Sequence, residues 1–216
     1  MSFDQLNRQD GMQRPLKVAY LCDADPRDPY LYSGGNARIF QALCSRFDDV
    51  TVLTQDWGLA EPLRQLVLRL PDPIILRAKW RLHLLLSRII ARRVRQQLAL
   101  QDYDVVFGAY SFHSFHNLRL PDTLVSVYTS DASPTTYKQS EVGQSFDSYL
   151  KISRLFDRLV QRAERVVFSQ MDLLLWPSDW MRRSANGMFD LTDAHSMTVP
   201  WGANVPDPGA ASGPQL

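Results

Sequence analysis

Six short apolar runs, each ending abruptly in polar, Gly or Pro residues, constrain the fold of this chain most. They span Leu16–Cys22, Val50–Thr54, Asp104–Ala109, Leu124–Thr129, Leu173–Trp176 and Met197–Pro200. Continuous runs of this length are typical of parallel strands buried on both faces. Stretches with helical spacing alternate with them, over Asn36–Phe47, Ala78–Gln101, Ser145–Gln170 and Asp179–Phe189. The alternation predicts an α/β fold, a doubly wound parallel sheet with right-handed crossovers in a single Rossmann-like domain.

Length and composition favour one domain. A chain of 216 residues with 45% hydrophobic content can bury a sizeable core. We place the domain at residues 15–206, after a flexible N-terminus at residues 1–14. Residues 207–216 are rich in small and turn-forming types, which predicts a linker or disordered tail. The 24 Lys and Arg residues nearly balance the 23 Asp and Glu residues, so the net charge favours no class of partner.

The cellular compartment is inferred from cysteine usage and from the N-terminal sequence. Cys22 and Cys44 are the only cysteines, and two such residues without a paired framework fit a reducing cytosol. The first residues lack the apolar core of a signal peptide, and no run of about 18 apolar residues is present to span a membrane. We therefore expect a cytoplasmic protein.

Paired glycines end the loop that follows the first apolar run. Ser33, Gly34, Gly35 and Asn36 stand where the next helix begins. Glycine lets the backbone approach a ligand closely, and a helix N-terminus offers oriented N–H groups to a phosphate. The pattern predicts a phosphate-binding turn, with a purely structural turn as the alternative. The dinucleotide fingerprint Gly-x-Gly-x-x-Gly is absent, so a nicotinamide cofactor is not expected, although Asp56 lies where its ribose-binding acid would be.

Polar side chains follow the apolar runs at what is predicted to be one edge of the sheet, beside a ligand crevice. The carboxylate of Asp131 is expected to orient a substrate hydroxyl or to accept its proton. The alternative is an aspartate that caps the next turn. The other candidate binding residues at this edge are Tyr110, Ser111, His113 and Ser178, the last of them at a position typical of a helix N-cap.

A strongly basic segment precedes the third run. Residues 64–95 contain nine Lys or Arg residues and a single acid. In a helical projection Arg81, Arg88, Arg92 and Arg95 share one face. Two interpretations stay open: a core-packed helix with a solvated basic side, or a surface for peripheral contact with anionic lipid or with a charged polyprenyl or saccharide ligand. Aromatic residues are not interleaved as base-stacking platforms, so nucleic acid is not expected as a partner.

The span Lys17–Pro206 resembles the N-terminal, acceptor-binding domain of family 4 glycosyltransferases, which have the GT-B fold. The segments that carry the resemblance follow the family's order: Ser33-Gly34-Gly35, Val127-Tyr-Thr-Ser-Asp-Ala132, the long helix with Ala163-Glu164, Trp176-Pro-Ser-Asp-Trp180 and Val199-Pro-Trp-Gly-Ala-Asn204. The glycine turn is similar to the family's loop near the donor phosphates and the acceptor. Much of the family has a histidine in the place of Asp131, so the aspartate resembles one subgroup.

The resemblance implies retaining, metal-independent transfer of a sugar from a nucleotide-sugar donor to a hydroxyl acceptor, either a saccharide or a lipid-linked molecule, without a further cofactor. Asp23-Ala24-Asp25 looks like the metal-binding Asp-x-Asp of the other glycosyltransferase architecture, but its place in the chain differs and no metal site is expected. The family's C-terminal donor-binding domain carries a Glu-x7-Glu motif, which this chain lacks. The resemblance therefore implies that this domain is missing as a partner and that the chain alone is inactive.

Two rival hypotheses use the same fold. One is a non-catalytic binding or membrane-docking module, and the other is a Rossmann domain that binds a nucleotide cofactor.

Overall fold

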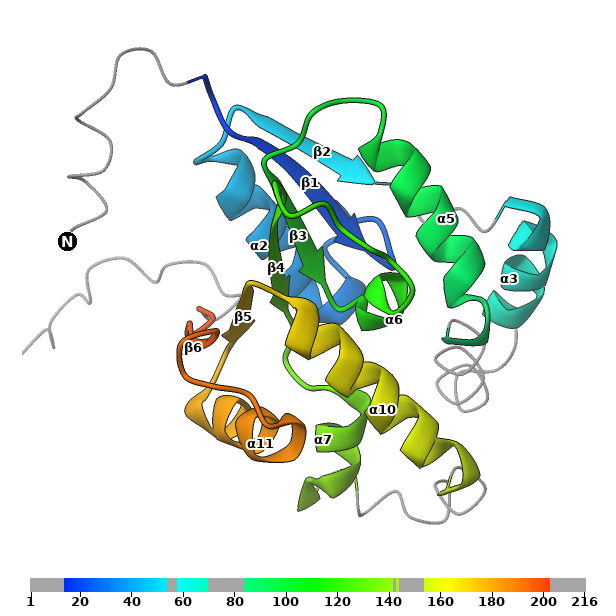
Figure 1. Cartoon of the computed structure of the whole chain (residues 1–216), viewed down its shortest axis with the longest axis vertical. Coiled ribbons are helices and arrows are strands. Elements are labelled where there is room, and N and C mark those ends of the chain that lie inside the picture. The colour runs from blue at the N-terminus through cyan, green and yellow to red at the C-terminus, as the bar shows by residue number, and fades with distance from the viewer. Residues whose placement is uncertain (1–13, 54–57, 70–83, 142, 144–153, 203–216) are drawn as a thin grey trace, which may run out of the picture.

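The computed structural model describes residues 14–53, 58–69, 84–141, 143 and 154–202, which form one parallel sheet flanked by helices (Figure 1). The six strands pair in the order β2-β1-β3-β4-β5-β6, every neighbour parallel. They are β1 (Lys17–Cys22), β2 (Asp49–Leu53), β3 (Val105–Ala109), β4 (Val125–Thr129), β5 (Leu173–Trp176) and β6 (Ser196–Thr198). This Rossmann-like α/β arrangement confirms the predicted fold class, and each strand overlaps its predicted run.

Helices fill the connections between strands. They are α2 (Gly35–Cys44), α3 (Glu61–Leu68), α5 (Ser87–Leu98), α6 (Phe112–Phe115), α7 (Pro134–Gln139), α10 (Arg154–Gln170) and α11 (Asp179–Phe189), with 3-10 turns η1 (Leu31–Gly34) and η2 (Gly58–Ala60). The predicted bounds of α11 are confirmed. Residues 78–83 and 145–153, where we expected α5 and α10 to begin, lie outside the described residues. Elements α3, α6 and α7 were not predicted.

The direction of the crossovers decides which face of the sheet each helix covers. The chain moves from β1 outward to β2, and every later connection runs the other way, toward β6. Because crossovers between parallel strands are right-handed, this reversal puts α2 on one face and the later helices on the other. Figure 1 shows α2 on the opposite side of the sheet from α5, α6 and α10.

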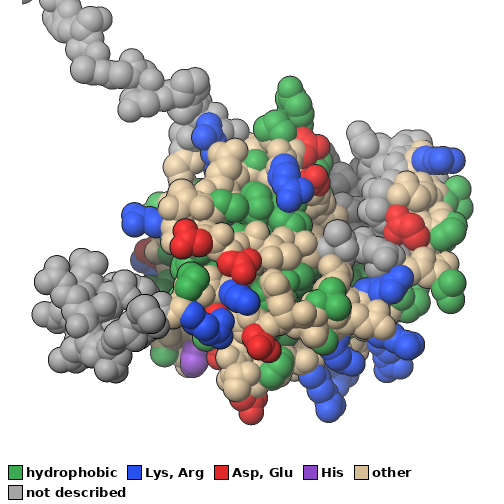
Figure 2. All heavy atoms as spheres, turned by 90° about the horizontal axis from the view of Figure 1, so that it is seen from above, with side chains coloured by type: hydrophobic (Ala, Val, Ile, Leu, Met, Phe, Trp, Pro, Cys, Tyr) green, Lys and Arg blue, Asp and Glu red, His purple; other side chains and the backbone are tan. Residues whose placement is uncertain are grey.

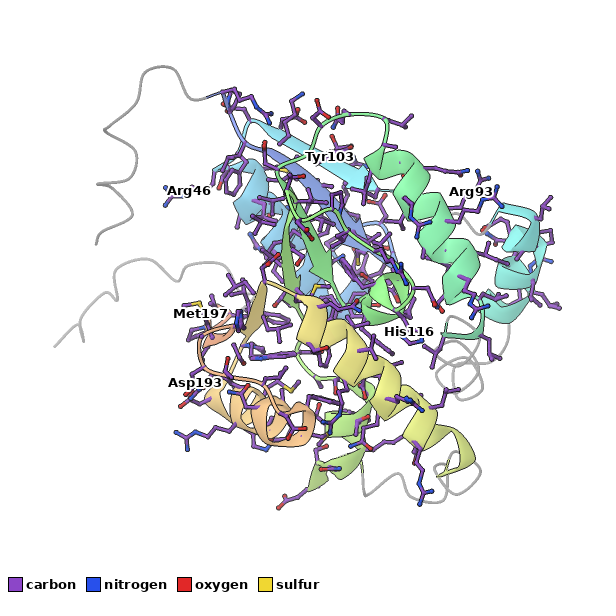
Figure 3. All side chains as sticks on the ribbon, viewed as in Figure 1. Arg46, Arg93, Tyr103, His116, Asp193 and Met197 are labelled. Carbon is purple, nitrogen blue, oxygen red and sulfur yellow. The ribbon has the colours of Figure 1, made fainter. Side chains whose placement is uncertain are left out.

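The larger core lies between the sheet and the later helices. Trp176 is completely buried there, and its ring packs at 5.5 Å from that of Phe168 on α10. Its Nε1–H donates to Ser196 Oγ at 2.9 Å, so burying the indole leaves no polar atom unpaired. The smaller core on the α2 face holds Tyr20, which stacks on Phe107. On that face Met197 of β6 is half-exposed, at the sheet edge marked in Figure 3.

Several predicted features lie outside the described residues. These are residues 1–13 of the N-terminal segment, the tail at 207–216, Asp56 and Arg81. Arg14 is described, and it pairs with Asp104 at 2.7 Å. Across the described ranges no helix has the length and apolar character needed to cross a membrane.

Candidate functional site

The strand order reverses between β1 and β3, and polar and aromatic residues gather where these strands end. The chain leaves β1 for β2 on one side and returns to β3 on the other. Ligands of open α/β sheets bind beyond the carboxyl ends of the strands at such a switch point, because the loops diverge there. The residues that meet in this place, termed the switch-point site, are Asp23, Tyr32, Ser33, Gly34, Gly35, Tyr110, Asp131 and Trp201.

The loop that enters α2 has an unusual backbone. Tyr32, Ser33 and Gly34 have consecutive φ values of 52°, 53° and 77°. Glycine adopts this left-handed region freely, whereas each of the other two residues costs on the order of 1 kcal/mol. Tyr110, across the site, also has a positive φ, of 60°. Strain of this kind is concentrated at ligand-binding and catalytic sites, so its convergence here makes the switch point a candidate functional site.

Three aromatic rings from separate segments form one side of the site. Tyr32 and Tyr110 stack with ring centroids 4.0 Å apart and planes 12° from parallel. Trp201 meets Tyr110 edge to face at 5.8 Å. Tyr32 also donates its hydroxyl hydrogen to a carboxylate oxygen of the buried Asp23 at the end of β1. Burial raises the pKa of Tyr32, and the adjacent Asp23 raises it further, so the phenol stays protonated and keeps donating.

Among the described residues the Tyr110 hydroxyl has no hydrogen-bond partner, and Tyr110 is buried, with only 9% of its surface exposed. It lies over the start of α2, where a Cβ added at Gly35 would be 3.1 Å from Tyr110 Oη. A Cβ atom at this position would be closer to the hydroxyl than most Cβ contacts are, so the Tyr110 side chain would have to shift. Helix α2 begins at Gly35, whose N–H donates to the Tyr32 carbonyl, and its N-cap residue Gly34 has no side chain to cap the N–H groups that follow. An unpaired buried hydroxyl beside uncapped N–H groups is suited to bind a polar ligand.

Asp131 follows β4 at the outer rim of the site and is exposed. Its Oδ1 accepts a hydrogen bond from the Ala132 N–H at 2.8 Å. Partial desolvation raises the pKa of its carboxyl, and the Asp131 charge in turn helps to raise the pKa of Tyr110. The cap of the next helix, α7, is Ser133, whose hydroxyl accepts from the Thr136 N–H. Ser133 therefore caps α7, and the bond from Ala132 to Asp131 is compatible with the alternative of an aspartate that caps the local turn.

A buried glutamate from α10 holds the segment that follows Asp131. Glu164 is 0% exposed, and its carboxylate accepts hydrogen bonds from the N–H of Thr135, at 3.1 Å, and from the Thr135 hydroxyl. Burial raises the pKa of Glu164 to about 7, and the bonds from Thr135 oppose that rise. Glu164 thus joins the segment that follows Asp131 to the core.

Four of the predicted binding residues have side chains engaged in the fold. Asn36 is 0% exposed and joins Tyr20 to Cys22, accepting from the Tyr20 hydroxyl at 2.6 Å. Ser111 donates its hydroxyl to the Leu21 carbonyl at 3.1 Å. The remaining two are His113, which is 1% exposed within α6, and Ser178, whose hydroxyl caps α11 by accepting from the Met181 N–H.

The other predicted residues come together. Ser33, Gly34, Gly35 and Tyr110 meet at the switch point, and Asp131 lies at its rim. Tyr32 was not predicted as a site residue, although it directly precedes Ser33 in the same loop. Glu164 was named only as part of the long helix that carries the family resemblance, without a role of its own. An acid flanked by apolar residues at helical spacing is the pattern that could have identified it.

The carboxylates of Asp23 and Asp25 do not lie together at one site. Asp23 is buried against Tyr32, whereas Asp25 is exposed and accepts from the Arg27 N–H at 3.0 Å. Within the described part of the chain, no group of three or more His, Cys, Asp or Glu side chains is arranged to hold a metal ion.

Comparison with protein-family models gave no match, and comparison with curated proteins gave none either. The structure defines the class as Rossmann-like α/β. Any functional assignment therefore rests on the residues of the switch-point site.

Proposed function

We propose that this chain is the acceptor-binding half of a retaining glycosyltransferase of the GT-B type, which moves a sugar from a nucleotide-sugar donor to a hydroxyl acceptor. The observation that carries the proposal is the unpaired, buried Tyr110 hydroxyl placed between the uncapped start of α2 and the Asp131 carboxylate. This arrangement offers hydrogen bonds to sugar hydroxyls and N–H groups to a phosphate. The donor would be held mainly by a second, C-terminal domain.

Each residue has a role in this proposal. Asp131 accepts a hydrogen bond from the acceptor hydroxyl and orients its oxygen toward the donor sugar. As the new bond to the anomeric carbon forms, the bond to the diphosphate oxygen breaks, and the hydroxyl proton passes to Asp131 or to the leaving phosphate. The backbone of Ser33, Gly34 and Gly35 faces that phosphate. No cofactor or metal ion takes part.

The aromatic rings supply the apolar part of the recognition. Sugars have C–H faces as well as hydroxyls, and the half-buried ring of Trp201, which packs on Tyr110, offers such a face a contact surface beside hydrogen-bonding groups. Asn36, Ser111, His113 and Ser178 then support the site from beneath, since their side chains lie in the core or cap a helix. The alternative, a non-catalytic binding module, shares the recognition chemistry and differs only in the role of Asp131.

The test is binding by the 216-residue chain. UDP-glucose, GDP-mannose and a set of oligosaccharides are titrated into the protein while the indole N–H signal of Trp201 is followed by NMR. We expect at least one oligosaccharide to shift that signal. Asp131→Asn should weaken this binding on the order of tenfold, because a hydrogen bond to a charged group contributes about 1.5 kcal/mol or more.

Asp122→Asn is the matched control. Asp122 is an exposed aspartate before β4, at the opposite end of the strand that Asp131 follows. It should bind like the wild type. Absence of a shift with every oligosaccharide, or equal weakening in the two variants, would contradict the proposal.

A further inference from the structure

We propose that η2, α3 and the outer face of α5 form a docking surface for an anionic lipid bilayer. The surface, termed the docking face, is separate from the switch-point site and does not depend on sugar transfer. It consists of two groups of residues, apolar Leu59, Leu63, Leu66, Leu85 and Ile89 and basic Arg88, Arg92 and Arg95.

The apolar group is exposed to solvent. Leu59 is fully exposed, Leu66 is 61% exposed and Leu85 is 63% exposed, while Leu63 and Ile89 are each 40% exposed. Single exposed leucines are common on protein surfaces. Five large aliphatic side chains in neighbouring elements expose more apolar surface than a single leucine does, and large exposed apolar patches are typical of interaction sites.

Helix α5 divides its side chains between two faces. Ile90, Ala91 and Val94 are buried in the larger core. The opposite side of α5 exposes Arg88, Ile89 and Arg92. Arg92 follows Arg88 by four positions and Ile89 by three, so the three residues lie on one face of the helix. The predicted basic face is therefore correct for the described arginines, and Ile89 is exposed beside them. The outer face of α5 therefore offers cations with an apolar side chain beside them, and electrostatic attraction and apolar burial are the two terms that together bind a protein to an anionic membrane surface.

The elements that carry the two groups are in contact. Gly58 of η2 lies against the guanidinium of Arg93 on α5. A Cβ atom added at Gly58 would be 3.1 Å from Arg93 Nε. Figure 1 shows α3 beside α5, at one end of the molecule. The leucines of η2 and α3 and the arginines of α5 thus belong to one region of the surface.

The arginines of the docking face have no acidic partners. Among the described residues Arg88, Arg92 and Arg95 form no ion pair, and the sequence from residue 84 to residue 101 contains no acid. Elsewhere Arg165 pairs with Asp190. Figure 2 shows several Lys and Arg side chains grouped along one side of the molecule. Unpaired cations complement a negatively charged surface.

The combination favours a bilayer over other anionic partners. Exposed cations near an anionic leaflet contribute about 1 kcal/mol each, and leucines that enter the headgroup region add an apolar term. A polyanion such as nucleic acid would use the arginines but leave the leucines in water. The described residues of the docking face include no aromatic side chain for base stacking.

The test is sedimentation of the whole chain with vesicles of phosphatidylcholine, with or without about 30 mol % phosphatidylglycerol. We expect binding only to the anionic vesicles, and less of it as salt rises from about 0.05 M to about 0.5 M. Arg88→Gln with Arg92→Gln should lower the partition coefficient about 30-fold, equivalent to about 2 kcal/mol. Leu66→Gln with Leu85→Gln should lower it about tenfold.

Matched controls carry the same changes elsewhere. Arg46→Gln with Arg183→Gln removes the same charge, and Figure 3 shows Arg46 on the opposite side of the molecule from Arg93. Leu159→Gln with Met197→Gln changes two other exposed apolar residues. Both controls should bind like the wild type. Absence of binding to anionic vesicles at low salt would overturn the proposal. So would controls that bind as weakly as the docking-face variants, or leucine variants that bind at full strength, since that result leaves only a general polyanion surface.

Discussion

Tyr110 combines features that packing alone does not explain. Its backbone is left-handed, its hydroxyl is buried without a partner, and its ring stacks on Tyr32. Each of the first two features lowers the stability of the free protein. A ligand that bonds the hydroxyl recovers part of that loss. This is the relation expected between stability and function at a binding site.

Tyr110→Phe tests this relation. Removing a buried hydroxyl that has no partner should raise the free energy of unfolding by about 1 kcal/mol, because the desolvation cost disappears while the ring stays. The same variant should bind the oligosaccharide of the NMR titration about fivefold more weakly. Urea unfolding measures the first effect and the titration measures the second.

Tyr103→Phe is the control, since Tyr103 is a half-buried tyrosine away from the carboxyl edge (Figure 3). It should leave ligand binding unchanged. A Tyr110→Phe protein that is less stable than the wild type would show that the hydroxyl has a structural partner.

The residues near the site could be predicted from the sequence better than the directions in which their side chains point. Gly34, Gly35 and Tyr110 were predicted, and their backbone geometry explains why they meet. Asn36 and Ser111 were also predicted as ligand contacts, but their side chains point inward and bond to the core. A polar residue at a strand or helix end can face ligand or core. The choice depends on partners such as the Leu21 carbonyl, which are close in space and far apart in sequence.

At the scale of elements, the β4–α7 connection depends on Glu164. The connection presents Asp131 and enters α7 through the Ser133–Thr136 capping box. Glu164 of α10 binds Thr135 at the start of that helix, while Lys138 near its end pairs with Asp157. Burying a carboxylate in this place makes the connection sensitive to pH.

Glu164→Gln should remove that sensitivity. Burial raises the pKa of Glu164 from 4.5 to about 7, so between these values the folded state holds a proton that the unfolded chain has released. The free energy of unfolding therefore falls as pH rises through this window and levels off above it. The full contribution is roughly 3 kcal/mol. A Gln side chain does not titrate, and it can accept from the Thr135 N–H through its amide oxygen and donate to the Thr135 hydroxyl through its amide nitrogen.

Urea unfolding of the wild type and of Glu164→Gln at about pH 5 and about pH 8 checks this prediction. The change in unfolding free energy between the two pH values is measured for each protein, and the wild-type change minus the variant change is the part attributable to Glu164. Glu164→Gln should gain stability relative to the wild type at the higher pH. Glu141→Gln, at an exposed position, should follow the wild type at both. Parallel pH profiles for wild type and Glu164→Gln would contradict the assignment.

The strands were predictable as elements because both of their faces are buried, which leaves continuous apolar runs. The long helices were predictable from their spacing. Helices α6 and α7 were missed because a helix of four or six residues is too short to show that spacing. Helix α7 had a local signal, Ser133 before Pro134, which is typical of a helix start.

For the whole molecule, the proposed function predicts that this chain transfers no sugar by itself. Transfer between two bound substrates requires both to be held in reacting geometry. In the proposal this chain holds the acceptor, whereas the donor is held mainly by the second domain. Incubation with UDP-glucose or GDP-mannose and the bound oligosaccharide should give no product above a blank without protein. Product formation would show that the chain holds the donor as well.

The position of β1 in the sheet also sets an order for folding during synthesis. Strand β1 pairs with β2 on one side and with β3 on the other, and Lys17 reaches its partner Asp104 over 87 positions of sequence. The β1–α2–β2 unit can assemble early, but one edge of β1 has no partner until the ribosome has released β3. Long-range pairing of this kind slows folding. In that interval the unpaired edge of β1 is accessible for binding to a chaperone or to a neighbouring nascent chain.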